Sequence, residues 1–159
     1  MKKVILIISM LLILFVSCVS TTVEVYSDIN MKGKTIYLSI DKQTTSVTSG
    51  GIGVPVGGMM LFSSSTETFM LGSIKNVQLI RQNLIDKGYD VVNNPDDADI
   101  ILVGESDSSL DLSRVRLGFF DKDTGDLVMV CEGTYGIGLD VQDDLNKALK
   151  KALDSIPKL

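Results

Sequence analysis

The stretch from residue 99 to residue 134, DIILVGESDSSLDLSRVRLGFFDKDTGDLVMVCEGT, decides the fold of this chain. Its first part, residues 99–104, is apolar on both alternating sets, which is typical of a strand that is covered on both faces or lies centrally in a sheet. Arg114–Phe120 and Leu127–Thr134 are two further strand-like runs. The polar segment between them contains Gly125, which can take the positive φ of a bulged hairpin turn. The stretch therefore predicts a buried strand followed by an antiparallel hairpin.

The flanking segments add three strands and two helices. Residues 23–26, 34–40 and 89–92 have the rhythm of short strands. Residues 69–88 and 139–156 carry apolar side chains three and four positions apart, as amphipathic helices do. The apolar stripe expected for the first helix contains Met70, Ile74, Val77, Ile80, Leu84 and Ile85. The order of elements predicts an α+β fold, in which two amphipathic helices pack on one face of a mainly antiparallel β-sheet.

Signals at both ends of the first expected helix help to set its bounds. Ser73 could cap a shorter version of this helix, because its hydroxyl can accept a hydrogen bond from a free backbone N–H of the first turn. Gly88 is a typical left-handed stop after the last turn. In the second helix, aspartates come first and lysines later, which matches the helix dipole.

The first 17 residues have the composition of a secretory signal peptide. Lys2 and Lys3 form a basic start, and an apolar run follows from Val4 to Val16. This run has about 13 residues, whereas a helix needs roughly 20 to cross a bilayer. The sequence therefore predicts that residues 1–17 are cleaved off, rather than kept as a membrane anchor.

The end of this signal, Phe15-Val16-Ser17-Cys18, resembles the lipobox of bacterial lipoproteins. The resemblance implies that the Cys18 sulfur is diacylated and that the new amino terminus is acylated by a fatty acid such as palmitate. Residues 18–22 would then be the lipidated terminus and a short tether, and residues 23–159 a single α+β domain held close to the bilayer. The alternatives are a plain secreted protein and a retained signal anchor.

Composition excludes several classes of function. The chain has no His, so Ser-His-Asp and Cys-His catalysis and His-ligated metal sites are excluded. The formal charge is −5, and cleavage before Cys18 would remove two lysines and make the chain more acidic. An acidic chain without a Lys/Arg cluster does not bind nucleic acid. Cys131 lies in an apolar run, and we expect it to be a small core residue rather than a nucleophile.

Residues 43–68 form a long stretch rich in Gly, Ser and Thr, with almost no charge. It predicts a long loop or a hairpin, and no Lys-Ser/Thr follows its glycines, as a phosphate-binding loop would require. One interpretation is a mobile loop. The other is a surface that contacts lipid or a partner through apolar side chains. These are Ile52, Val54, Val56, Met59, Met60, Leu61 and Phe62.

Two groups of carboxylates are candidates, one for a calcium site and the other for acid–base catalysis. Asp121 and Glu132 are spaced like positions one and twelve of a calcium loop that would include Asp123 and Asp126, but Gly125 sits one place early and the flanks read as strands. We expect a solvated turn there. The second group could pair as acid and base, although carboxylates beside a strand usually limit edge pairing. It consists of Asp96, Asp97, Asp99, Glu105 and Asp107. We expect no catalytic residues, no metal site and no cofactor.

Several short motifs resemble bacterial lipoproteins that contain the domain of unknown function 4136. They are Asp28–Tyr37 (DINMKGKTIY), Leu84–Tyr89 (LIDKGY), Pro95–Val103 (PDDADIILV), Asp121–Val128 (DKDTGDLV) with Glu132-Gly133, and Ile156-Pro157. The resemblance implies an architecture and a location, and it carries no catalytic residues to this chain.

The sequence thus predicts a lipid-anchored protein of the bacterial cell envelope that acts as a non-enzymatic binding or structural module. Its partners would be the membrane, through the lipid anchor, and an envelope protein, through an exposed sheet edge or the glycine-rich stretch. Val19 is not the Asp that commonly retains lipoproteins at the inner membrane, which favours the periplasmic face of the outer membrane in a diderm cell. The alternative is a subunit of an oligomeric secretion or pore assembly, in which residues 43–68 pair across protomers.

Overall fold

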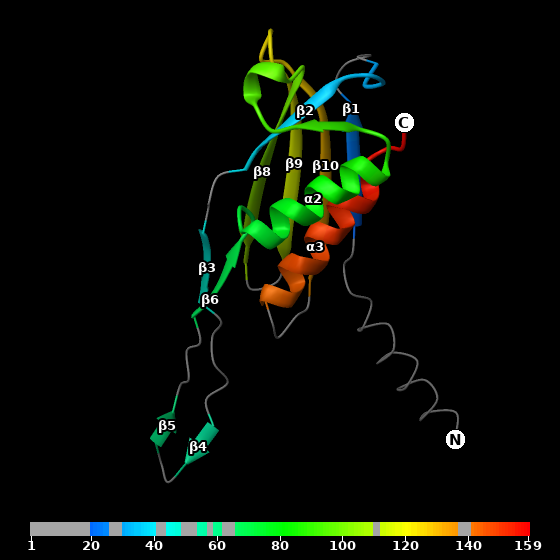
Figure 1. Ribbon diagram of the computed structural model, residues 1–159. Coiled ribbons are helices and arrows are strands. Elements are labelled where there is room, and N and C mark those ends of the chain that lie inside the picture. Colours follow the sequence, from blue (N-terminus) through cyan, green and yellow to red (C-terminus); the bar gives the residue numbers. More distant parts are fainter. Residues whose placement is uncertain are drawn as a thin grey trace, which may run out of the picture.

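The computed structural model describes residues 20–25, 30–40, 44–48, 54–56, 59–61, 66–109, 112–136 and 141–159. These residues form a six-stranded sheet, two shorter two-stranded sheets and two helices (Figure 1). The elements in chain order are β1 (Ser20–Val25), β2 (Thr35–Ser39), β3 (Thr44–Thr48), β4 (Val54–Val56), β5 (Met59–Leu61), β6 (Thr66–Met70), α2 (Ile74–Asp86), β7 (Asp90–Val92), the 3-10 turn η1 (Pro95–Asp97), β8 (Ile100–Ser108), β9 (Ser113–Asp121), β10 (Leu127–Tyr135) and α3 (Val141–Ser155).

The main sheet has the strand order β1-β10-β9-β8-β2-β7. Its first four strands pair antiparallel, whereas β2 is parallel to both β8 and β7. The parallel pairing follows from the connection, because α2 lies between β2 and β7 in the chain and a parallel pair needs such a crossover. β8 lies centrally, between β9 and β2, as one of the two predicted alternatives has it. The other alternative, a strand covered on both faces, is wrong, because the helices cover only one face of the sheet and Val103 lies on the other. The predicted α+β fold with a mostly antiparallel sheet is confirmed.

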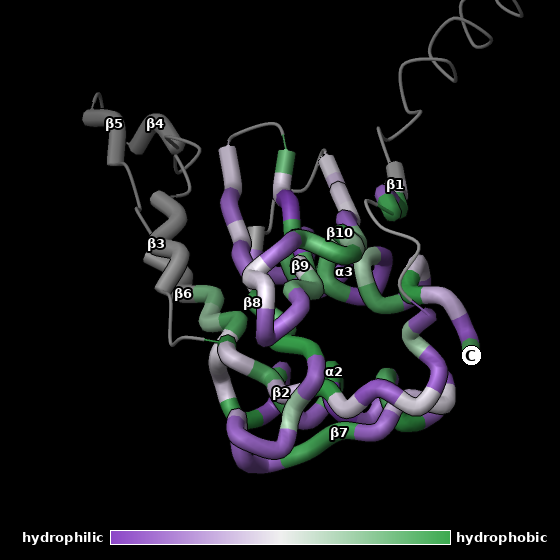
Figure 2. The backbone as a smooth tube through the Cα atoms, turned by 90° about the horizontal axis from the view of Figure 1, so that it is seen from above, coloured by the Kyte–Doolittle hydropathy of each residue, from purple (hydrophilic) through white to green (hydrophobic). Residues whose placement is uncertain are grey.

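Both helices lie on the same face of this sheet. Seen from above in Figure 2, the strands follow a curve from β1 round to β7, and α2 and α3 lie on its inner side. The core between the two layers contains fully buried strand residues together with one stripe of α3. From the strands come Ile36, Ile100, Leu102, Val115, Leu117 and Phe119, from α3 come Leu145, Ala148, Leu149, Ala152 and Leu153, and Ile156 follows directly after the helix.

One glycine allows α3 to lie directly on β10. A Cβ atom at Gly133 would stand 2.1 Å from the Ala148 carbonyl oxygen and 2.4 Å from the Ala152 nitrogen, both of them backbone atoms of α3. Because backbone atoms cannot turn aside as side chains do, no residue other than glycine fits here at this helix–sheet distance.

The helix predicted over residues 69–88 begins later than the periodicity indicated. Ser73 is its N-cap and accepts a hydrogen bond from the Asn76 backbone nitrogen, as the shorter version required. Phe69 and Met70 belong instead to β6, where they pair with β3. The end is as predicted, with Gly88 at a φ of 94°.

The apolar stripe of α2 is narrower than predicted. Ile80 and Leu84 are fully buried, but Ile74 is 79% exposed and Ile85 is 48% exposed. The buried Asn76 occupies part of the inner side, where its Nδ2 donates to the Met70 carbonyl oxygen at 2.9 Å. The helix therefore packs through one line of side chains, and two of the predicted core positions lie on its outer surface.

Two pairs of short strands occupy parts of residues 43–68, which we call the arm. β3 pairs with β6, and β4 pairs with β5, both antiparallel. In Figure 1 β3 and β6 lie beside the lower end of the main sheet, and β4 and β5 lie beyond it. Ile52 and Phe62 lie outside the described residues.

The chain enters the sheet earlier than predicted. β1 begins at Ser20, within the tether expected over residues 18–22, and it pairs with β10 along its whole length. Residues 1–17 and Cys18 lie outside the described residues. Within the part of the chain that the structure describes, no helix is both long enough and apolar enough to span a membrane.

Candidate functional site: the open face of the sheet

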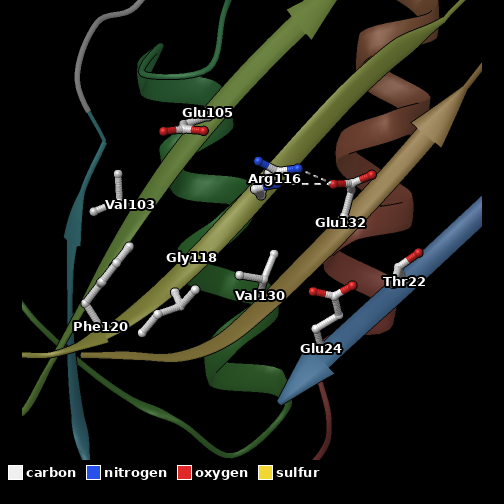
Figure 3. A pocket seen from close by; sticks show the side chains of 10 residues that line it. Thr22, Glu24, Val103, Glu105, Arg116, Gly118, Phe120, Val130 and Glu132 are labelled. Atoms are coloured by element: carbon white, nitrogen blue, oxygen red, sulfur yellow. Dashed lines mark hydrogen bonds and ion pairs between the residues drawn. The ribbon is translucent and has the colours of Figure 1, made fainter. Parts of the chain in front are cut away.

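The face of the sheet that carries no helix holds the best candidate site. A shallow cavity of about 430 Å³ lies on it and is lined by side chains from four neighbouring strands. Figure 3 shows these side chains on the side of the sheet away from the helices. The lining residues are Thr22 and Glu24 of β1, Val103 and Glu105 of β8, Arg116, Gly118 and Phe120 of β9, and Leu127, Val130 and Glu132 of β10.

Strand register gathers these residues into two rows. Thr22 lies opposite Glu132, Glu132 opposite Arg116, and Arg116 opposite Glu105, which makes a polar row across four strands. The next row on the same face contains Glu24, Val130, Gly118 and Val103. Because side chains alternate between the two faces of a strand, the residues between these rows point to the helices instead.

Ion pairs organise the polar row. The Arg116 guanidinium donates to Glu132 Oε2 from Nη2 at 2.9 Å and from Nε at 3.1 Å. Arg114 Nε stands 3.5 Å from Glu132 Oε1, and Arg114 Nη1 stands 4.0 Å from Asp107 Oδ2. The hydrogen bonds to Glu132 raise the pKa of Arg116 above its usual value, against a smaller opposing effect of burial. The row therefore presents a fixed arrangement of opposite charges.

The second row continues into an apolar floor, which consists of Val103, Gly118, Phe120, Leu127 and Val130. All of its side chains are half-buried. A Cβ at Gly118 would lie 2.9 Å from Cε2 of Phe120, so the absence of a side chain there lets the aromatic ring lie over β9. An apolar floor beside paired charges suits contact with another molecule.

The five carboxylates of the second group predicted from sequence are spread over three places. Asp96 and Asp97 lie in η1, and Glu105 and Asp107 lie at the open face on β8. Asp99 joins the starts of β2 and β8, because its Oδ2 accepts from the Thr35 nitrogen at 2.9 Å and from Thr35 Oγ1 at 3.0 Å. These hydrogen bonds, with Lys34 nearby, lower the pKa of Asp99. A carboxylate held in its charged form this way is a structural acceptor.

The calcium-like group is a hairpin turn, as predicted. Asp121 Oδ1 accepts from the backbone nitrogens of Asp123 and Thr124, both at 3.0 Å, and these bonds lower its pKa. Glu132 lies away from the turn, on the open face with Arg116. Among the residues that the structure describes, no three His, Cys, Asp or Glu side chains stand close enough to hold a metal ion.

Cys131 lies on the opposite face of β10 from Glu132 and is completely buried. Burial raises the pKa of its thiol from 9.0 to about 11, partly offset by a hydrogen bond with Ser155. The prediction that Cys131 is a core residue is confirmed, and the buried neutral thiol is a poor nucleophile.

Sequence reasoning missed the open face, although its alternating pattern is present in the sequence. Val103 and Glu105, Arg116 and Gly118, and Val130 and Glu132 each stand two positions apart. Combining them required knowledge of the register between strands. It also required the pairing of β1 with β10, which no local pattern indicates.

Comparison with solved structures gives weak likenesses, of which two are described here. No family model matches the chain, and no curated protein matches it. The dodecamer of a single-residue variant of PelC from Paraburkholderia phytofirmans is similar with a TM-score of 0.42 and 14% identity, covering 86% of this chain and 98% of that chain. The PelC dodecamer from the same organism gives a TM-score of 0.41 and 16% identity, covering 84% and 96%. Likenesses at this level carry no argument about function, and the resemblance to the 4136 family stays a prediction.

Proposed function

We propose that this chain is a lipid-anchored protein of the bacterial cell envelope and a non-enzymatic module that binds an envelope protein through its open sheet face. The observation that carries the proposal is where the fold begins. β1 starts at Ser20, two residues after the cysteine of the lipobox-like sequence. Cleavage before Cys18 would therefore leave every described element intact, and it would place the acylated residue within about 8 Å of the sheet.

The open face supports the binding part of the proposal. It spans four strands, or about 14 Å from β1 to β8 at the usual strand spacing. It combines an apolar floor with the ion-paired Arg116 and Glu132, and apolar contact with a bordering polar rim is the usual composition of a protein interface. We assign the envelope location, on the periplasmic face of the outer membrane in a diderm cell, on the basis of the signal and of Val19.

The experiment on the anchor uses the full chain with its own signal, expressed in a bacterium that is fed an alkyne analogue of palmitate. The wild-type protein should carry the label and sediment with membranes. The Cys18→Ser variant should lose the label and keep residues 1–17, because the signal peptidase of lipoproteins requires the cysteine.

The matched control is Cys131→Ala, which removes the other, buried cysteine and should leave labelling unchanged. Labelling and processing of Cys18→Ser equal to wild type would overturn the proposed anchor. Mass spectrometry of the wild-type protein gives an independent reading, since the proposal requires residues 1–17 to be absent and Cys18 to carry acyl chains.

One observation favours a second candidate, a subunit of an oligomeric secretion or pore assembly. The arm contains two separate two-stranded sheets, β3–β6 and β4–β5, and each strand of such a sheet has one edge whose backbone groups are open to another strand. Copies of this chain could pair through these edges. Light scattering of the detergent-extracted protein separates the candidates, because the first predicts a monomer or dimer and the second predicts a ring-sized particle.

A further inference from the structure

We infer that the tip of the arm, formed by β4 and β5, is a second membrane contact that lies in the interfacial layer of the bilayer holding Cys18. The inference rests on the lipid anchor of the proposed function and adds a second, non-covalent attachment site to it. It is argued from sheet topology, from the distribution of charge along the arm and from the lengths of its strands.

Sheet topology places the start of β1 and the root of the arm at the same end of the molecule. Ser20 pairs with Thr134 near the end of β10, and Tyr135 pairs with Ser113 at the start of β9. The end of β8 lies there too, because Ser108 pairs with Ser113. β2 runs parallel to β8, so the chain leaves β2 toward this same end.

The chain continues in this direction after β2. Ile40 lies beside Gly104 of β8, where its side-chain atoms would be 3.5 and 3.6 Å from a Cβ at that glycine. β3 begins at Thr44, five residues after Ser39. β8 extends by the same number of residues beyond Val103, the partner of Ser39. β3 and β6 lie beside the last part of β8, because Thr44 pairs with Met70 and the next residue, Leu71, would be 2.7 Å from a Cβ at Gly104. The arm continues from there, and its strands β4 and β5 lie beyond this end of the sheet in Figure 1.

Charge disappears along the arm from its root to its tip. Asp41 and Lys42 lie before β3 and Glu67 lies in β6, but residues 43–66 contain no charged side chain. β3 and β6 are rich in threonine, whereas β4 reads VPV and β5 reads MML. This order, with charge at the base, hydroxyls along the legs and apolar residues at the tip, follows the polarity gradient from water into a membrane interface.

The dimensions allow the anchor and the arm tip to reach one bilayer together. β1 and β2 are separated by four strand spacings, or about 19 Å, which sets the lateral distance between the two contacts. β4 and β5 lie beyond the end of the sheet at which β1 begins (Figure 1). Cys18 is two residues from Ser20, so a membrane held at Cys18 lies within the reach of the arm.

Strand length indicates an interfacial position rather than a spanning one. A membrane-spanning strand needs about 9–11 residues and a closed barrel, since unpaired backbone groups are not tolerated in the hydrocarbon region. β4 and β5 have three residues each and pair only with each other among the described strands. In the interfacial layer, water can satisfy their outer edges while the apolar residues enter the acyl boundary.

The test uses the mature acylated protein in phosphatidylcholine vesicles, with a polarity-sensitive fluorophore attached at Met60→Cys in β5. Nitroxide-labelled lipids should quench this probe, and its emission should shift to the blue on vesicle addition. The matched control carries the probe at Ile74→Cys, an apolar residue that is 79% exposed at the start of α2. Quenching by nitroxides placed near the headgroups should be about twofold stronger at Met60 than at Ile74, because the tip enters the interfacial layer. Cys131 is buried and does not compete for the label.

Three results would overturn the inference. Equal quenching at both positions in fully acylated protein would leave the anchor in place and remove the arm contact. A blue shift without lipid quenching would show that a protein surface covers the tip instead. Strong quenching by nitroxides at the bilayer centre, together with a ring-sized particle, would show a spanning barrel of several copies. Failure of the anchor itself would be distinguished by a mass without acyl chains.

A second variant keeps the test valid if the labelled protein is perturbed. Deleting Ile52–Gly58 removes β4, one of the two strands of the arm tip, and none of the residues of the core between the main sheet and the helices. We expect the variant to unfold at the same urea concentration as wild type. We also expect it to leave the vesicles faster than wild type once the acylated terminus has been cleaved off. Unchanged release would also overturn the arm contact.

Discussion

Cys131 shows how strongly a single buried position depends on its surroundings. The thiol lies between β10 and α3 with no exposed surface, and burial raises its pKa to about 11. The sequence predicted this role correctly, because the residue lies in an apolar run without a neighbouring His or Lys. The same run did not show that the next residue, Glu132, lies on the open face beside a charged partner. That arrangement depends on the register of β10 with β9, which places Arg116 opposite Glu132.

The raised pKa of Cys131 predicts a pH dependence of stability. The folded protein favours the neutral thiol, so this contribution is complete below pH 9.0 and is lost as the pH rises toward about 11. At pH 10.5 the free energy of unfolding should have fallen by about 2 kcal/mol from this group. Urea unfolding under reducing conditions at pH 8 and pH 10.5 measures it, with Cys131→Ala as the reference. An equal decrease in both proteins would contradict the prediction.

Among the elements, those with the strongest periodicity were predicted best. α3 and the β9–β10 hairpin have nearly the expected bounds, because the buried apolar residues of α3 share one stripe and Gly125 marks the turn with a φ of 74°. The predicted start of α2 was wrong for a physical reason. Phe69 and Met70 fit a helical period, but pairing with β3 places them in a strand, and such pairing between distant segments leaves no local pattern.

The contact between α3 and β10 predicts a large effect of one methyl group. Gly133→Ala should lower the free energy of unfolding by about 1–3 kcal/mol, because the new Cβ would overlap backbone atoms of α3. The matched control is Gly118→Ala on β9, where the nearest atom is the movable ring of Phe120. We expect the control to lose less than about 1 kcal/mol in urea unfolding. Equal losses would show that the helix can shift away from β10.

At the scale of the whole molecule, the fold class followed from the order of elements, but the sheet order did not. β1 pairs with β10 at the other end of the chain, and β2 lies between β8 and β7. Both facts depend on pairing between segments that are far apart in the sequence, and the first joins segments separated by more than half of its length. The open face depends on the first of them, because β1 contributes Thr22 and Glu24 to the cavity.

The open face predicts where the partner protein binds. Arg116→Glu would place two like charges opposite each other on β9 and β10, and it should abolish recovery of the partner after mild crosslinking of intact membranes. Its cost to folding should be about 1 kcal/mol, because the Arg116 side chain is 44% exposed although that of Glu132 is only 21% exposed. Lys75→Glu on α2 makes the same change of charge on the other side of the molecule and should leave recovery intact. A crosslinking pattern unaffected by Arg116→Glu would show that this face is not the interface.

The early start of β1 has a mechanical consequence. The strand is at the edge of the main sheet, and its first residue, Ser20, is the one nearest to Cys18. A pulling force between the membrane and the rest of the molecule would be directed along β1, at right angles to its hydrogen bonds with β10. Such a load stretches the bonds of all six residues together in shear, instead of opening them one after another like a zipper. β1 would thus resist a pulling force that acts on the lipid anchor.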